Sequence, residues 1–158
     1  MNRPTLYILC GPAGCGKSTW AHKYMETHPE VRYVSRDEIR FNLVKQDEHY
    51  FSHEKQVFSK FSGTIAQTLI DGFDVIADAT HLNMTSRKKL TNAIDRHFTK
   101  YDIIYVVFNV PLATCITRNA KRSGRANVPN EVIENMYEQF HAPIAEDMRY
   151  KDYIRVGE

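Results

Sequence analysis

Short apolar segments alternate with amphipathic ones along most of this chain. Runs rich in β-branched and aromatic residues predict strands at residues 5–10, 31–35, 73–78 and 101–110. The run 101–110 is nearly continuous in apolar residues, which is typical of a central parallel strand buried on both faces. Residues 152–156 predict a last strand at an edge of the sheet.

Helices are predicted between these strands. The clearest is residues 49–71, where apolar residues recur at spacings of three and four and Gly72 predicts the end. Asn83 or Thr85 is expected to cap a later helix. The full set of expected helices covers residues 18–25, 37–45, 49–71, roughly 84–98, 111–121 and a segment that starts at Pro129. This alternation predicts an α/β fold in which a parallel sheet has helices on both faces. The carboxyl ends of its strands would meet at one edge, where such sheets bind ligands.

Length and composition add few constraints. A chain of 158 residues predicts one domain over 1–158, and 42% hydrophobic with 25% charged residues is ordinary for a globular protein. There is no 18-residue apolar run, the first strand begins too early for a signal peptide, and the three cysteines lack metal-site spacing. We therefore expect a cytoplasmic protein with reduced thiols, no membrane contact and no obligate protein partner. The net charge of +2 is too small to indicate nucleic-acid binding by itself.

The most specific motif is Gly-Pro-Ala-Gly-Cys-Gly-Lys-Ser at residues 11–18, a full match to the phosphate-binding loop (P-loop). It lies between a predicted strand and a predicted helix, which is the context that the motif requires. Lys17 can reach the β- and γ-phosphates, and the Ser18 hydroxyl can hold Mg²⁺. The donor is therefore expected to be a nucleoside triphosphate. Its expected contacts are Gly11, Ala13, Gly14, Cys15, Gly16, Lys17, Ser18 and Thr19.

A second polar cluster follows the second predicted strand. Asp37 and Arg40 are three residues apart and would share one face of a helix. Asp37 is the candidate general base for an acceptor hydroxyl, and Arg40 is a candidate to hold an acceptor phosphate beside it. A helix cap with a surface ion pair is the alternative explanation of these residues.

A third cluster follows the strand that ends at Asp78. This carboxylate is a candidate to assist the metal together with Ser18. The next residue is Ala79 instead of a glutamate that could activate water, which favours transfer to a hydroxyl over hydrolysis. Thr80, His81 and Asn83 are candidate acceptor contacts.

A fourth cluster, residues 118–125, holds four positive charges and no negative one. Arg118 and Arg122 would share a helix face, and Gly124, Ala126 and Asn127 indicate a polar tip. We expect a lid over about 118–129 that closes on the triphosphate and brings Arg122 to its phosphates. A solvated basic turn is the alternative.

Taken together, these motifs resemble the polynucleotide 5′-kinase family of P-loop phosphotransferases. The strongest elements are residues 11–20, 35–40, 75–83 and 118–133. The resemblance implies a P-loop kinase fold with three α/β/α layers, a central parallel sheet of about five strands and a short Arg-rich lid. It also implies Asp37 as general base, Arg40 as acceptor-phosphate clamp, and Arg122 on the donor phosphates with Arg118 as helper. Compared with the pattern of that family, the lid carries one extra residue between Arg122 and Val128.

The implied reaction moves the γ-phosphate of ATP to the 5′-hydroxyl of DNA or RNA in the presence of Mg²⁺. Arg36, Arg40, Arg87, Lys88 and Lys89 could line a positive entrance groove for such an acceptor. One alternative is a kinase of a small-molecule hydroxyl, such as a nucleoside, sugar, antibiotic or toxin-type sugar-nucleotide. An alternative of another class is a nucleotide-binding module without catalysis.

Overall fold

Parallel strands form the centre of the molecule. The computed structural model describes residues 3–45, 47–124 and 127–157. Within these ranges five strands pair, all in parallel, in the order β2-β3-β1-β4-β5. Their bounds are β1 (Thr5–Cys10), β2 (Arg32–Ser35), β3 (Val75–Asp78), β4 (Asp102–Phe108) and β5 (Tyr150–Val156). The predicted α/β class, with about five parallel strands, is confirmed.

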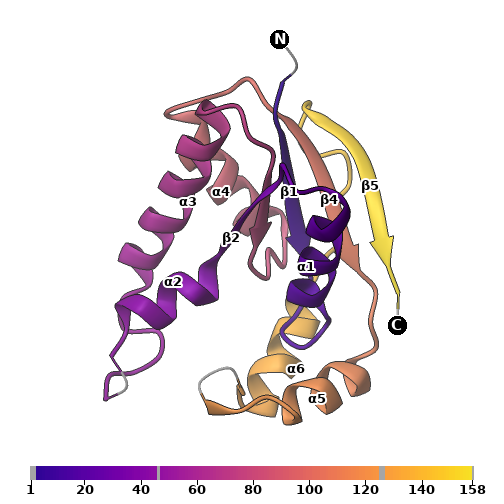
Figure 1. Cartoon of the computed structure of the whole chain (residues 1–158). Helices are drawn as coiled ribbons and strands as arrows, with labels where there is room; N and C mark the ends of the chain where they lie inside the picture. The colour runs from indigo at the N-terminus through magenta and orange to yellow at the C-terminus, as the bar shows by residue number, and fades with distance from the viewer. Residues whose placement is uncertain (1–2, 46, 125–126, 158) are drawn as a thin grey trace.

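Helices cover both faces of this sheet, as Figure 1 shows. The described helices are α1 (Lys17–Thr27), α2 (Arg36–Leu43), α3 (Glu54–Ile70), α4 (Met84–Asp95), α5 (Leu112–Ala120) and α6 (Asn130–Gln139). Alternate residues of β1 enter different cores. Leu6 and Ile8 pack with α3 and α4, whereas Tyr7 and Leu9 pack with α1, α5 and α6. A strand buried on both faces has no polar face, which explains its continuous apolar sequence.

The helix ends predicted at Asn83 and Gly72 are confirmed. Asn83 caps α4 through a capping box with Ser86, and Gly72 follows α3 at a φ of +92°. The helix predicted over 49–71 is too long at its start, because α3 begins at Glu54 and the preceding residues form turns. His53 in these turns lies 2.6 Å from Glu48, a contact that periodicity does not detect.

The carboxyl ends of the strands meet at one edge, which is the lower edge in Figure 1. The P-loop follows β1, α2 follows β2, and residues 79–83 follow β3, so the first three polar clusters reach this edge together. Helices α5 and α6 pack against each other below it. None of the described helices is both long and apolar enough to cross a membrane.

Candidate active site

The P-loop has the backbone conformation that its glycines allow. Gly14 and Gly16 have φ values of +82° and +96°, which side chains strongly disfavour. A Cβ atom on Gly14 would also lie 2.4 Å from the carbonyl oxygen of Cys115. Helix α1 begins at Lys17, within the loop motif, so its N-terminus faces the same space.

Lys17 is held inside this loop. Its side chain is buried, and Nζ donates to the carbonyl oxygens of Gly11 at 3.0 Å and Pro12 at 2.8 Å. The ammonium therefore lies within the phosphate cradle. Cys15 is buried beside it, and burial raises the pKa of this thiol, so it is not a reactive thiolate. The three cysteines are free and buried, consistent with the expected reduced thiols.

Ser18 and Asp78 form the second feature of the site. Ser18 Oγ donates to Asp78 Oδ2 at 2.8 Å, and the Tyr33 hydroxyl donates to the same oxygen at 2.5 Å. The described residues contain no group of three His, Cys, Asp or Glu that could enclose a metal by itself. A hydroxyl with one carboxylate suits Mg²⁺, which takes oxygen ligands and commonly completes its shell with substrate phosphates and water. The donor set therefore fits the predicted metal pair of Ser18 and Asp78.

Asp37, Arg40 and Glu54 form the third feature. Arg40 Nη1 donates to Asp37 Oδ1 at 2.6 Å, and its Nε and Nη2 donate to the two Glu54 oxygens at 2.8 and 2.7 Å. The Arg40 side chain is 8% exposed, whereas that of Asp37 is 62% exposed. The buried guanidinium thus fixes a carboxylate that remains accessible from the cavity.

Charge pairing dominates the electrostatics of this cluster. Burial lowers the pKa of Arg40, but the hydrogen bonds to Glu54 and the charges of Glu54 and Asp37 outweigh burial and raise it above its ordinary value. Burial raises the pKa of Glu54, but the bonds to Arg40 outweigh that effect and hold it below its ordinary value. Both groups are therefore charged at neutral pH. Arg36 also contacts Glu54, and its Nε is buried without a hydrogen-bond partner among the described residues.

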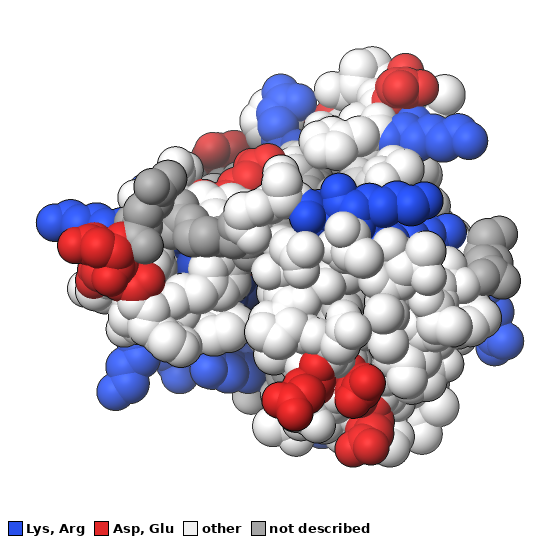
Figure 2. All heavy atoms as spheres, turned by 90° about the horizontal axis from the view of Figure 1, so that it is seen from below, with Lys and Arg blue, Asp and Glu red and all other residues white. Residues whose placement is uncertain are grey.

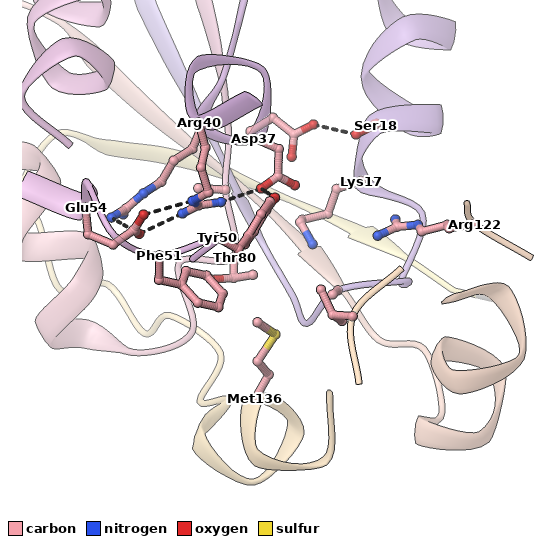
Figure 3. A pocket seen from close by; sticks show the side chains of 15 residues that line it. Lys17, Ser18, Asp37, Arg40, Tyr50, Phe51, Glu54, Thr80, Arg122 and Met136 are labelled. Atoms are coloured by element: carbon pink, nitrogen blue, oxygen red, sulfur yellow. Dashed lines mark hydrogen bonds and ion pairs between the residues drawn. The ribbon is translucent and has the colours of Figure 1, made fainter. Parts of the chain in front are cut away.

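A cavity of about 280 Å³ joins these three features. In Figure 3, Lys17 and Arg122 approach from one side, Arg40, Glu54 and Phe51 from the other, and Asp37 lies between them. The lining residues are Ala13, Lys17, Ser18, Arg36, Asp37, Arg40, Tyr50, Phe51, Glu54, Asp78, Ala79, Thr80, Arg122, Val128 and Met136. Residues from four separate sequence clusters therefore share one cavity.

The two arginines at the start of the expected lid make different contacts. Arg122 lines the cavity, whereas Arg118 donates from Nη1 to the Cys15 carbonyl oxygen at 3.1 Å and braces the P-loop. At the base, the Asn119 amide donates to the Val128 carbonyl at 2.6 Å and accepts from the Val128 N–H at 3.1 Å. Arg125 and Ala126, which belong to the basic stretch and its expected tip, lie outside the described residues.

Three other expectations need correction. His81 does not face the acceptor, because its buried ring bonds the Leu9 carbonyl at 2.7 Å. Asn83 caps α4 instead.

Arg87 cannot line an entrance groove, because its 2% exposed side chain is paired with Glu146 at 2.6 Å. Figure 2 shows Lys and Arg at several separate places around a broad uncharged surface, not in one continuous stripe. Of the predicted P-loop contacts, Ala13, Lys17 and Ser18 line the cavity.

Sequence reasoning missed five residues of the site: Tyr33, Tyr50, Phe51, Glu54 and Met136. None belongs to a recognisable motif. Glu54 lies 14 residues from Arg40 on another helix, and Met136 comes from α6. Tyr33 lies on β2, and Tyr50 and Phe51 lie in the turns before α3, so only the tertiary packing of these segments brings the five residues to the site.

The fold and the site together define a P-loop nucleotide-binding domain with the kinase fold. A family model described as an AAA domain matches residues 6–143, which is most of the chain. The chain belongs to this family.

The chain is similar to several proteins that are named as kinases. It is 30% identical over 140 residues to an L-seryl-tRNA(Sec) kinase of Methanococcus maripaludis, covering 87% of this chain and 53% of that protein. It is 24% identical over 166 residues to a protein of Autographa californica nuclear polyhedrosis virus, provisionally assigned as a bifunctional polynucleotide kinase/RNA ligase. That match covers 97% of this chain and 22% of the viral protein.

A solved structure also matches the fold of this chain. A chain of the Pnkp1/Rnl/Hen1 RNA repair complex superposes with a TM-score of 0.76 and 26% identity, covering 88% of this chain and 44% of that chain. These comparisons confirm the resemblance to polynucleotide kinases and the P-loop kinase fold. The chain spans about half or less of the length of these relatives.

Proposed function

We propose that this protein is an ATP- and Mg²⁺-dependent phosphotransferase whose acceptor is the 5′-hydroxyl of DNA or RNA. The observation that carries the proposal is the shared cavity. It places the P-loop Lys17, the Ser18–Asp78 pair, the accessible Asp37 carboxylate and the lid residue Arg122 around one space. Phosphoryl transfer needs mainly charge neutralisation, alignment and a base for the acceptor, and these residues supply each requirement.

The donor side consists of the P-loop and the lid. Backbone N–H groups and Lys17 bind the β- and γ-phosphates, and Arg122 stabilises charge that develops during transfer. Ser18 and Asp78 hold Mg²⁺, which when bound neutralises negative charge on the phosphates. ATP, in preference to GTP, rests on the family resemblance.

The acceptor side consists of Asp37 and Arg40. Asp37 accepts the hydroxyl proton as the acceptor oxygen forms its bond to the γ-phosphorus, and the bond to the leaving ADP oxygen breaks. A guanidinium has five N–H groups, and on Arg40 three of them donate to the carboxylates of Asp37 and Glu54. The others can hold an acceptor phosphate.

A second candidate acceptor is a serine hydroxyl carried on tRNA. It is favoured by the match to the L-seryl-tRNA(Sec) kinase, which covers 87% of this chain. In both candidates the hydroxyl is linked to a nucleic acid, and Asp37 would act as the general base toward it.

The first test is transfer of labelled γ-phosphate from ATP, with Mg²⁺, to 5′-hydroxyl DNA and RNA oligonucleotides, beside serine-charged tRNA. We expect Asp37→Asn to keep ATP binding and to lose at least about a hundredfold in transfer rate. Glu38→Gln is the matched control, because this exposed carboxylate on the same helix does not line the cavity. Normal transfer by Asp37→Asn would overturn the assigned mechanism.

The salt dependence of acceptor KM separates nucleic-acid acceptors from small molecules. Phosphate-backbone contacts make binding fall steeply with salt, whereas a neutral small acceptor should respond little. Labelling of neither nucleic acid, with ATP still bound, would favour a small-molecule hydroxyl. ATP binding without transfer to any acceptor would indicate a nucleotide-binding module.

A further inference from the structure

Two adjacent aromatic rings, Tyr50 and Phe51, line the acceptor side of the cavity, and no recognised motif accounts for them. Their ring centroids are 4.9 Å apart at an interplanar angle of 82°, so one ring edge meets the other ring face. Both lie in the turns just before α3, at the point where the sequence periodicity wrongly continued the helix.

Both rings contact the Asp37–Arg40 pair. The Tyr50 hydroxyl donates to Asp37 Oδ1 at 3.2 Å. The Arg40 guanidinium lies 5.0 Å from the Tyr50 ring centroid and 5.2 Å from that of Phe51, within cation–π range. The position of the rings is thus fixed relative to the carboxylate that would accept the acceptor proton.

Phe51 remains accessible beside the cavity, since the residue is 42% exposed. Figure 3 shows the ring facing the cavity, with Met136 of α6 rising below it toward the same space. An aromatic surface that remains accessible beside a hydroxyl-binding position is suited to an acceptor with an apolar, planar group.

We propose that Phe51, supported by Tyr50, is the stacking platform for the base of the acceptor's terminal nucleoside. This inference rests on the proposed function and names the group that the acceptor must carry. A nucleobase presents a π-face, as every base does, and stacks on aromatic side chains. Tyr50 lies between the two positions that such a nucleoside would occupy. Its hydroxyl contacts Asp37, where the 5′-hydroxyl would bind, and its ring contacts Phe51, where the base would stack.

The test compares two acceptors in two readouts. One acceptor is a 5′-hydroxyl hexanucleotide, and the other is the same hexanucleotide with an abasic 5′-terminal residue. Equilibrium binding without ATP and phosphate transfer with ATP are measured for the wild type, Phe51→Ala and Phe51→Trp. Phe73→Ala is the matched control, because Phe73 is 37% exposed and precedes β3 at the opposite edge of the sheet.

We expect Phe51→Ala to raise the Kd and KM of the base-bearing acceptor about tenfold, within the range of aromatic–base stacking. Phe51→Trp should keep the Kd and KM of this acceptor near their wild-type values. The KM of ATP should not change in any variant, and Phe73→Ala should behave as the wild type. The abasic acceptor should bind the wild type weakly and should be nearly insensitive to Phe51→Ala. Equal losses for both acceptors, or no loss, would overturn the platform.

These readouts separate failure of the platform from failure of the proposed function. Transfer that does not depend on Phe51 would remove the platform and leave the kinase. Phe51-dependent binding of the base-bearing acceptor without transfer would support the platform and overturn the proposed transfer. Neither binding nor transfer would overturn both.

Discussion

Asp78 shows how single residues carry this site. One of its carboxylate oxygens accepts hydrogen bonds from both Ser18 and Tyr33. The Tyr33 ring in turn lies 5.0 Å from that of His22 on α1. Burial and the neighbouring Asp78 raise the pKa of Tyr33, so the phenol stays protonated and donates at all ordinary pH values. Tyr33 thereby orients the carboxylate that would face the metal.

We expect Tyr33→Phe to weaken the Mg²⁺ affinity of the nucleotide complex by about tenfold, because groups that orient metal-binding side chains typically contribute that much. Calorimetric titration of ADP at increasing Mg²⁺ concentration measures the effect. The affinity for ADP without Mg²⁺ serves as the control and should not change. Equal weakening with and without Mg²⁺ would show that Tyr33 supports the loop instead of the metal position.

Glu54 provides a second test at this scale. Glu54→Gln preserves size but removes the charge that holds Arg40 in a two-pronged contact. We expect transfer to fall by about tenfold or more, with an unchanged Kd for ATP, because Asp37 and Arg40 then lose their fixed arrangement. Steady-state kinetics with varied acceptor, together with ATP binding, measure this. Loss of ATP affinity equal to the loss of transfer would contradict the assignment of Glu54 to the acceptor side.

At the scale of elements, the connection from β3 to α4 links the P-loop to the core formed by α3 and α4. His81 has a φ of +41° and bonds the Leu9 carbonyl, while the Gly11 N–H donates to the Thr80 carbonyl at 2.9 Å. Arg87 donates to the His81 carbonyl at 2.9 Å and pairs with the nearly buried Glu146. The connection is therefore tied to β1, α4 and the segment before β5.

His81 makes the stability of this connection dependent on pH. Burial lowers its pKa to about 3, whereas an unfolded histidine has a pKa of about 6.5. Below about pH 6.5 the unfolded chain binds a proton that the folded protein rejects, so this contribution is lost as pH falls toward 3. Between pH 6 and 4, the wild type should lose on the order of 1 kcal/mol per pH unit more than His81→Asn.

Denaturant unfolding at several pH values measures this difference. Asparagine is the suitable replacement because it tolerates positive φ and does not titrate. Comparison of the two slopes cancels the contribution of the carboxylates, which both proteins share. Parallel slopes would show that the histidine is not rejecting a proton in the folded state.

At the scale of the whole molecule, the parallel sheet assembles the site from segments far apart in sequence. Its order β2-β3-β1-β4-β5 places the P-loop on a central strand, with the clusters that follow β2 and β3 on one side. The segment between α5 and α6 reaches the cavity through Arg122 and is fixed at its base by Asn119. The arrangement suits a cover that brings positive charge to bound phosphates.

Arg122→Ala tests this cover. We expect the turnover number to fall about a hundredfold, with little change in the Kd of ATP, because the arginine acts mainly on charge that develops in the transition state. Single-turnover transfer and equilibrium ATP binding provide the two values. Lys121→Ala is the control, since it removes the same charge from an exposed neighbour. A normal turnover number for Arg122→Ala would exclude the lid role.

The sequence predicted this architecture where signals are local. The P-loop glycines, the Asn83 cap and the Gly72 stop each depend on a few neighbouring residues, and each has the expected conformation or contact. The pairing of Asp37 with Arg40 followed from helical spacing alone. Two of the corrected expectations, the roles of His81 and Arg87, concern residues whose partners are more than 50 positions away.

By itself, therefore, the sequence determined the α/β class and the phosphate-binding loop, and it predicted Asp37 as the carboxylate that would accept the acceptor proton, because periodicity and backbone conformation act over short distances. Only the tertiary structure decided which residues surround that carboxylate. Glu54, Phe51 and Met136 reach it from α3, the preceding turn and α6, and burial decides whether an arginine such as Arg87 is a ligand-binding group or a buried ion pair. Such contacts are set by how the helices pack on the sheet, and no local pattern encodes that packing.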